Sequence, residues 1–393
     1  MARKNIAVGI DIGTNQIKII VAEANPGGLP TILSATSVPS RGIRHGYIEN
    51  IKETAKSLQE AINLAQKESG IAIKEAYLSI GGIGLGSIFS HGSTVISKAD
   101  LEITKLDQDK AVKSSETSIP QSMIINRRII YTIPLAYKID GKISLGGPVG
   151  ARGTKLESKT LFITCIEKHF YDLIRAVEEA GVSIIDVTAS PIASGTVTLN
   201  KAQKNAGCVL ANIGAETVSI VVYENNIPIS LETFSIGSND ITNDIALGLK
   251  ISLEEAEQVK VDPAHNHSRK KLEEIVVARL SDIFELIENH LKRIGKNGLL
   301  PAGIIFTGEG AKISPIEELA KAYLKLPSKI SGPLVGREDK GIQIQDPKWS
   351  TAYGLCVLGL LNDDDSTIKI GWGTTIMKPI GTTIRKWLTQ FLP

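Results

Sequence analysis

The segment that follows the first apolar run of the sequence combines residue types that bind phosphate. It runs from Asp11 to Asn15, and Lys18 follows closely. Glycine lets the backbone approach a ligand, and successive N–H groups in a tight turn can point into one concavity. We expect Gly13, Thr14 and Asn15 to form that concavity, with Lys18 as a point charge facing the phosphates. Asp11 could hold a magnesium ion through water, because this ion prefers oxygen ligands and keeps much of its hydration shell.

Two later segments match the first one. An apolar strand from Val209 to Ala211 leads into a second glycine turn, and a strand ending at Phe306 leads into a third. The residues expected at the ligand are Asn212, Gly214, Ala215, Glu216 and Thr217 in the second turn, and Gly308, Glu309 and Gly310 in the third. One such turn alone is a weak signal, and an ordinary tight turn is its simpler interpretation. The repetition favours a shared phosphate-binding cleft.

Hydrophobic patterns predict the elements that must position these turns. Two stretches, Asn5 to Ala24 and Gly207 to Tyr223, read as strand, glycine turn and returning strand, which makes a weak internal repeat. A capped amphipathic helix is predicted from Ile51 to Glu68, with Asn50 ahead of it and Gly70 after it. The repeat predicts two hairpins of similar construction.

Three further segments are predicted between and after the two hairpins in the sequence. A long amphipathic helix is predicted from Ser268 to Gly295. Another helix should start after the third turn, with Ser314 as its N-cap and Pro315 as its first residue. From Gly84 to about Lys159, short β-like runs broken by glycines indicate an inserted subdomain.

Length and composition limit the possible classes of protein. At 393 residues the chain is longer than one core comfortably fills, so two lobes are expected. With 22% charged residues and a net charge of +2, nothing draws the whole chain to nucleic acid, and we expect no such partner. The wide spacing of Cys165, Cys208 and Cys356 argues against a zinc module or a disulfide framework. Because an apolar strand begins directly after Lys4 and no apolar run approaches the ~18 residues of a membrane span, we expect a cytoplasmic protein with peripheral membrane attachment at most.

The three turns resemble the nucleotide cleft of the superfamily of actin, sugar kinases and heat-shock chaperones. Within it, nearly the whole chain resembles the FtsA family of bacterial cell division proteins. The stretches that carry this likeness are Asn126 to Arg128, Ile133 to Tyr137, Gly147 to Gly150, Leu161 to Cys165, Ser235 to Ile245 and Ala256 to Lys260. The resemblance implies an α/β, actin-like two-lobed fold, with duplicated ribonuclease H-like lobes of mixed sheets and flanking helices, and an inserted FtsA-type subdomain.

The same resemblance implies a division of the chain into six parts. These are the start of the first actin-like lobe at 1–83, the inserted subdomain at 84–160, the return to the first lobe at 161–200, the second lobe at 201–361, a flexible linker at 362–376 and an amphipathic membrane-targeting helix at 377–393.

The resemblance also assigns cofactors and further residues to the cleft. It implies ATP and Mg²⁺, with Asp11 as the metal residue. Gly237 would lie beside the nucleotide, and Glu257 and Lys260 would reach its ribose and base from one helix. Their spacing alone is equally compatible with a surface ion pair.

The sequence departs from the family pattern at three cleft positions. Asn212 stands where aspartate is usual, so a carboxylate that would position magnesium or the attacking water is missing. Glu216 and Glu309 stand where glycine is expected, and their charge would oppose phosphates if it pointed inward. We therefore predict that ATP binds with magnesium and turns over slowly or not at all.

The last residues of the sequence have the pattern of an interfacial helix. One apolar stripe and a basic border consist of Ile380, Ile384, Trp387, Leu388 and Phe391, and of Arg385 and Lys386. Such a helix suits the surface of an anionic membrane. A helix folded back onto the core is the alternative. The polar tract before it and the family resemblance, which implies a terminal membrane-targeting helix, favour the membrane.

The resemblance implies partners and a location as well. An FtsA-type protein polymerises, binds the C-terminal tail of the tubulin-like protein FtsZ and other division proteins, and ties FtsZ to anionic lipids. It does so as a peripheral protein on the cytoplasmic face of the cell membrane, at the division site. Arg279 matches a family arginine at the FtsZ-binding site, and an arginine beside an aliphatic groove suits an acidic, apolar tail. A plain solvated arginine is the alternative.

Two other function classes remain open. A PilM-like component of a type IV pilus or secretion machine would share the inserted subdomain, but such proteins generally lack the terminal helix. A sugar or acetate-type kinase would need an aspartate or histidine base and a sugar pocket, and no residues at recognisable spacing supply them.

Overall fold

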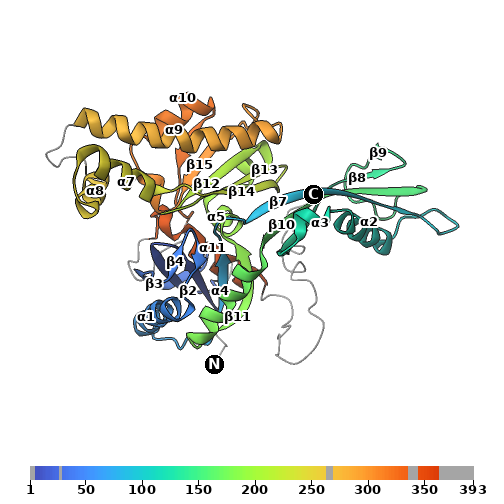
Figure 1. Ribbon diagram of the computed structural model, residues 1–393. Coiled ribbons are helices and arrows are strands. Elements are labelled where there is room, and N and C mark those ends of the chain that lie inside the picture. Colours follow the sequence, from blue (N-terminus) through green and yellow to red (C-terminus); the bar gives the residue numbers. More distant parts are fainter. Residues whose placement is uncertain (1–4, 26–28, 263–268, 335–343, 363–393) are drawn as a thin grey trace. The chain divides into compact units, whose positions relative to one another are not determined.

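The computed structural model describes residues 5–25, 29–262, 269–334 and 344–362. These residues form two compact units, and Figure 1 gives the order of their elements. The first unit contains residues 5–83, 171–228 and 232–362 of the described chain, and the second contains Gly84–Phe170 with Ile229–Leu231. The domain limits expected from the sequence stay predictions.

A five-stranded sheet forms the first part of the first unit. Its strands, in spatial order, are β11 (Ser183–Ala189), β6 (Glu75–Ile80), β1 (Ile6–Ile12), β2 (Gln16–Glu23) and β3 (Thr31–Pro39). Strands β1 and β2 are antiparallel and place Asp11 opposite Lys18, whereas β6 runs parallel to β1. Continuous apolar stretches make this sheet buried along most of its length, as in sheets covered on both faces.

Helices of the first unit pack on this sheet. α1 (Ile51–Ser69) packs on β2 and β3; Asn50 caps it by accepting from the Glu53 N–H, and Gly70 ends it in a left-handed conformation, which confirms the prediction. α11 (Ser350–Asn362) packs on β1 and on α5 (Ser190–Thr198). These contacts are close, because a Cβ at Gly9 would lie 2.2 Å from the carbonyl oxygen of Ala352. Three short elements complete this part: β4 (Ile43–Arg44), β5 (Tyr47–Ile48) and α6 (Lys201–Ala206).

A second five-stranded sheet repeats the topology of the first. Its strands, in spatial order, are β14 (Ile227–Phe234), β13 (Val218–Glu224), β12 (Cys208–Ile213), β15 (Ile304–Thr307) and β16 (Ser328–Ile330). As in the first sheet, an antiparallel hairpin, β12 and β13, is followed by two strands parallel to its first member. The internal repeat predicted from the sequence is confirmed.

Four α-helices and two short 3₁₀ turns belong to this second part. They are α7 (Ser238–Leu249), α8 (Leu253–Val261), α9 (Arg269–Arg293), α10 (Ile316–Leu324), η1 (Glu309–Lys312) and η2 (Pro347–Trp349). The long helix α9 buries the predicted apolar face, together with Phe284, whose ring lies 6.0 Å from that of Phe306. The predicted start of α10 was wrong: Pro315 has the non-helical angles φ −106° and ψ 62°, so the helix begins one residue later, at Ile316.

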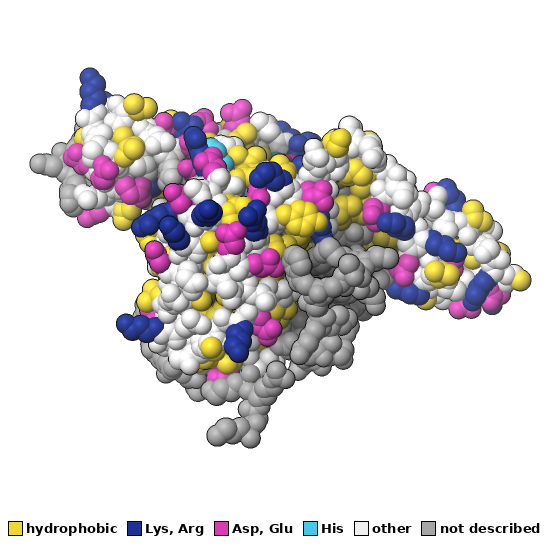
Figure 2. Space-filling view, turned by 60° about the horizontal axis from the view of Figure 1, so that its bottom comes forward, with side chains coloured by type: hydrophobic (Ala, Val, Ile, Leu, Met, Phe, Trp, Pro, Cys, Tyr) yellow, Lys and Arg dark blue, Asp and Glu magenta, His cyan; other side chains and the backbone are white. Residues whose placement is uncertain are grey.

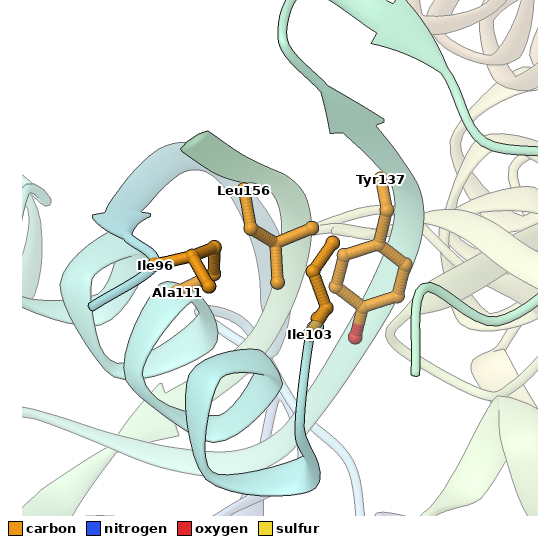
Figure 3. Packing of buried hydrophobic residues seen from close by; sticks show 5 residues of the cluster. All are labelled: Ile96, Ile103, Ala111, Tyr137 and Leu156. Atoms are coloured by element: carbon orange, nitrogen blue, oxygen red, sulfur yellow. The ribbon is translucent and has the colours of Figure 1, made fainter. Parts of the chain in front are cut away.

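The second unit has a four-stranded antiparallel sheet of its own. Its strands, in spatial order, are β7 (Gly86–Val95), β10 (Lys155–Ile166), β8 (Arg127–Ile139) and β9 (Lys142–Ile143). α2 (Lys105–Thr117) packs on β7 and β10, α3 (Gln121–Ile124) contacts β8, and α4 (Glu167–Glu179) follows the sheet. Figure 3 shows its buried cluster, which consists of Ile96, Ile103, Ala111, Tyr137 and Leu156. The unit therefore has its own core.

Two properties of the surface bear on the classes considered above. On the face shown in Figure 2, basic and acidic side chains are interspersed. Among the described residues, no helix combines the length and apolarity that a bilayer crossing demands.

Candidate nucleotide-binding cleft

The turn between β1 and β2 has a shape that needs glycine. The N–H of Gly13 donates to the carbonyl oxygen of Gln16 at 3.0 Å, and a Cβ at Gly13 would lie 2.9 Å from the same oxygen. The hydroxyl of Ser40 donates to the Gly13 carbonyl at 2.6 Å. The turn is therefore fixed from within, and its Thr14 and Asn15 side chains bond outside it, to the Gly46 N–H and to Glu309.

The turn between β12 and β13 has the same construction. The N–H of Gly214 donates to the Thr217 carbonyl at 2.8 Å, and a Cβ at Gly214 would lie 2.9 Å from that oxygen. Gly237, the N-cap of α7, supports this turn from behind, since a Cβ there would lie 2.4 Å from the Ala215 carbonyl oxygen. The two hairpins thus match in atomic detail as well as in pattern.

The third turn, after β15, packs directly on the second. Gly308 has φ 91° and ψ 175°, and a Cβ there would lie 2.2 Å from Oδ1 of Asn212 and 2.6 Å from the Ile213 carbonyl oxygen. A Cβ at Gly310 would also meet Ile213, at 2.6 Å. Glycine is therefore required by the close approach of the two backbones.

All three turns line one cavity of about 90 Å³. The predicted residues that line it are Asp11, Gly13, Thr14, Asn15, Lys18, Asn212, Gly214, Ala215, Thr217, Gly308 and Glu309. Five predicted residues do not line it: Glu216, Gly237, Glu257, Lys260 and Gly310. The structure thus brings the phosphate-binding candidates of the sequence together, while their contacts with a nucleotide stay a prediction.

Several lining residues were missed from the sequence. They are Ile12, Gln16, Gly46, Ser79, Gly81, Gly82, Ser190, Ser219, Lys348 and Thr351. The glycine pair after β6 could have been found, because a strand that ends in two glycines marks a close backbone approach, here of Gly82 to Gly46. Lys348 lies in η2 and Thr351 in the first turn of α11, where the sequence carries no comparable pattern.

Burial dominates the electrostatics of Asp11. Loss of solvent raises the pKa of its carboxyl, while the charge of Lys18 and a 2.7 Å hydrogen bond from the Ser79 hydroxyl act in the opposite direction. Lys18 is itself buried, with 6% of its surface exposed. A half-buried carboxylate beside a buried ammonium group is a strongly polar site that would favour a bound cation and phosphate together.

Two acidic side chains enter this region from the second sheet. Glu309 accepts a hydrogen bond from the Asn15 side-chain amide at 3.1 Å and lies 3.8 Å from Nζ of Lys18. Glu216 accepts a hydrogen bond from the backbone N–H of His45 at 2.5 Å. Both carboxylates therefore bond to groups on the side of the first sheet.

Asn212 is held by hydroxyl groups. Its side-chain amide donates to Oγ of Ser194 at 3.3 Å and to Oγ1 of Thr351 at 3.4 Å, and these two hydroxyls are bonded to each other at 2.9 Å. An amide has no acid–base function at neutral pH, so this position cannot supply a general base.

Comparison with known proteins decides the family. The family model described as Cell division protein FtsA matches residues 209–354, and the model described as SHS2 domain inserted in FTSA matches residues 82–164. The Cell division protein FtsA of Pseudomonas aeruginosa is 28% identical over 384 residues, which cover 91% of this chain and 90% of that protein. That of Bacillus subtilis is 28% identical over 396 residues, covering 95% of this chain and 87% of the relative. The chain belongs to the FtsA family.

Solved structures support the actin-like fold of this FtsA-family chain. A PilM–PilN type IV pilus biogenesis complex matches with a TM-score of 0.66 at 18% identity, over 90% of this chain and 98% of that one. MreB5 of Spiroplasma citri bound to ADP matches with a TM-score of 0.51 at 12% identity, over 89% of this chain and 94% of that one. At such identities the likeness shows the fold alone. PilM is therefore a structural neighbour, and the sequence relatives place the chain among FtsA cell division proteins.

Glu257 and Lys260, expected at the adenosine in an FtsA-type cleft, form a compact polar group. Nζ of Lys260 lies 2.7 Å from the Glu257 carboxylate and 2.8 Å from Oγ1 of Thr242, whose hydroxyl donates to Glu257 at 2.6 Å. The Lys260 side chain is only 6% exposed. This burial goes beyond an ordinary surface ion pair, although the adenosine role stays a prediction.

The remaining predicted residues of this FtsA-family chain divide into two groups. Arg279 on α9 forms a two-pronged pair with Asp244 of α7, at 2.6 and 3.0 Å, and lies 3.3 Å from Asp282. The predicted membrane residues, Ile380, Ile384, Arg385, Lys386, Trp387, Leu388 and Phe391, lie outside the described residues, as do the predicted linker from 363 onward and residue Ser268. Within the described ranges, no group of three or more metal-binding side chains occurs, so a Mg²⁺ ion would depend on Asp11 with water and phosphate oxygens.

Proposed function

We propose that this FtsA-family protein binds ATP with Mg²⁺ in the cleft between its two sheets. The observation that carries the proposal is the convergence of three glycine turns on one cavity that contains Asp11 and Lys18. The turn at Thr14 and Asn15 would bind phosphate, Lys18 would balance its charge, and Asp11 would hold Mg²⁺ through water. When bound, Mg²⁺ neutralises phosphate charge.

Hydrolysis is expected to be slow or absent. The second hairpin offers the amide of Asn212 in place of a carboxylate, and that amide is engaged by Ser194 and Thr351. A water molecule near it would lack a base to take its proton. Rapid hydrolysis by the purified protein, abolished by Asp11→Ala, would overturn this part of the proposal.

Equilibrium binding of ATP to the full chain tests the nucleotide site. In Mg²⁺, Asp11→Asn should weaken binding roughly tenfold or more, which corresponds to ~1.4 kcal/mol, and the loss should shrink when Mg²⁺ is replaced by EDTA. Glu60→Gln, an exposed change on α1, is the matched control and should bind like the unmodified protein. Undetectable binding at millimolar ATP, or equal affinities for the Asp11 variant and the control, would refute the site.

We further propose that the protein polymerises and anchors FtsZ filaments to the inner face of the cytoplasmic membrane. The support is membership of the FtsA family together with the apolar stripe and basic border of residues 377–393. Burying several apolar side chains contributes ~1.5–3 kcal/mol each before the cost of ordering, and polymerisation would strengthen such an attachment by avidity.

Two measurements test this second proposal. Removal of residues 382–393 should abolish cosedimentation with anionic liposomes, and the truncated protein should still fold and bind ATP as before. A fluorescently tagged full chain should form a mid-cell band that disappears when FtsZ is depleted. A polar or diffuse signal would instead favour a pilus-type role, or neither.

Arg279 remains a candidate contact for the FtsZ tail. Its bonds to Asp244 tie α9 to α7, so a carboxylate of the tail would have to share or replace that partner. Arg279→Ala should weaken binding of an FtsZ tail peptide. Arg293→Ala should not, although it also removes an arginine of α9, one that is bonded to Glu232 of β14. Equal effects of the two changes would assign Arg279 a structural role only.

A further inference from the structure

One internal carboxylate occupies groups that the proposed nucleotide site requires for phosphate. Glu309 accepts from the Asn15 amide and lies 3.8 Å from Nζ of Lys18. The Lys18 side chain is 8% exposed and that of Glu309 is 30% exposed. The ammonium group of Lys18, which is expected to face phosphate, therefore already faces the carboxylate of Glu309, which follows a strand of the second sheet.

The second carboxylate makes a similar bridge. Glu216, in the turn between β12 and β13, accepts the backbone N–H of His45 at 2.5 Å, and the N–H of Gly46 donates to Oγ1 of Thr14 at 3.0 Å. The segment of His45 and Gly46 is thereby tied to both hairpin turns. Hydrogen bonds in which the acceptor is ionised are about twice as strong as neutral ones, so these contacts favour a closed cleft.

The size of the cavity agrees with these contacts. Its volume of about 90 Å³ is well below the ~300–1,000 Å³ of small-molecule sites. A nucleotide would need the space that the Glu309 side chain takes, and its phosphates would be repelled by that carboxylate at Lys18. Since Glu309 is partly exposed, its side chain can leave towards solvent without unfolding the turn.

We propose that Glu309 is an internal stand-in for phosphate, that Glu309 and Glu216 together hold the cleft closed without nucleotide, and that ATP enters by displacing the Glu309 carboxylate from Lys18 and Asn15. The inference rests on the proposed binding of ATP. Glu309 would then be an autoinhibitory residue that lowers the affinity of the site for ATP. The cleft would also close without nucleotide, so its closure would depend only in part on ATP.

Binding measurements on the full chain test the displacement. Glu309→Gln keeps a hydrogen-bond acceptor for Asn15 but removes the charge, and Glu309→Gly removes both. We expect Mg²⁺–ATP to bind at least about fivefold more tightly to Glu309→Gln and more tightly again to Glu309→Gly. Glu318→Gln, an exposed change on the neighbouring helix α10, should bind like the unmodified protein. Equal affinity of all four proteins would overturn the displacement while leaving ATP binding intact.

Hydrogen exchange of the nucleotide-free proteins tests closure separately. Because the His45 N–H is bonded to Glu216, its exchange reports contact between the two sides. Exchange at His45 should be faster in Glu309→Gln and in Glu216→Gln than in Glu318→Gln, and Mg²⁺–ATP should slow it again in Glu309→Gln. Unchanged exchange in both variants would overturn the role of the two glutamates in closure. If no variant binds ATP, the proposed nucleotide function fails together with the displacement, and exchange alone decides closure.

Discussion

Replacing Gly308 by alanine places a methyl group where three backbone segments meet. The added Cβ would lie 2.2 Å from Oδ1 of Asn212 and 2.6 Å from the carbonyl oxygen of Ile213. In addition, φ 91° and ψ 175° fall in a region that residues other than glycine avoid, at a cost of ~1–3 kcal/mol. Overpacking of this kind costs a further ~1–3 kcal/mol, so Gly308→Ala should destabilise the protein by about 2–6 kcal/mol.

Gly70→Ala separates the two contributions. Gly70 also has a positive φ of 71°, with ψ 16°, but a Cβ there meets no atom within 4 Å. Its replacement should therefore cost only the ~1–2 kcal/mol of a left-handed alanine. Urea denaturation followed by circular dichroism, on matched samples, gives both changes in the free energy of unfolding. If Gly308→Ala costs no more than Gly70→Ala, the close packing of the third turn on the second hairpin is wrong, and the ATP affinity of Gly308→Ala should then be unchanged too.

Three further predictions concern the cores and a titrating carboxyl. Leu280→Ala empties a fully buried position on α9 and should cost ~2–5 kcal/mol in urea denaturation. Burial raises the pKa of Asp186 to about 7, so the native state keeps a proton that the unfolded chain loses near pH 4. The stability of the protein should therefore fall as the pH rises from about 4 to 7. Asp186→Asn should raise Tm by a few degrees more at pH 8 than at pH 4. Gly92→Ala would place a Cβ 2.1 Å from the backbone nitrogen of Ser115, so it should destabilise the second unit. Hydrogen exchange in β7 and β10 should therefore become faster, and ATP binding should stay unchanged.

Much of the fold was predictable because local patterns and tertiary packing agree. The helix from Ile51 has a cap, an apolar stripe and a terminating glycine, and the structure contains each of them. The two hairpins were found from apolar runs on both sides of a glycine turn, since a tight turn requires that residue. The start of α10 was missed because Pro315 fits the first turn of a helix in principle, whereas here its φ of −106° and ψ of 62° are not helical and it precedes the helix.

The candidate cleft was predictable only in part, for a physical reason. Residues of the turns carry their chemistry in consecutive positions, so Asp11 and Gly13 stand out in the sequence. Lys348 and Thr351 line the cavity from η2 and α11, which are far from the three turns in the sequence, and no spacing along the chain indicates that approach. The sequence also showed that Glu309 adds negative charge to the cleft, but only the structure shows its bonding partners, Asn15 and Lys18.

The second unit has a hydrophobic core of its own, so its surface can be altered independently of the first unit. Since Ile103, Tyr137 and Leu156 pack against one another, outward-facing residues of the insert can be changed without disturbing the glycine turns of the candidate cleft. The hairpin tip at Gly141, where a Cβ would meet no atom within 4 Å, is consequently a suitable place to graft a reporter or an epitope. Such a graft would leave both ends of the chain free for experiments in cells.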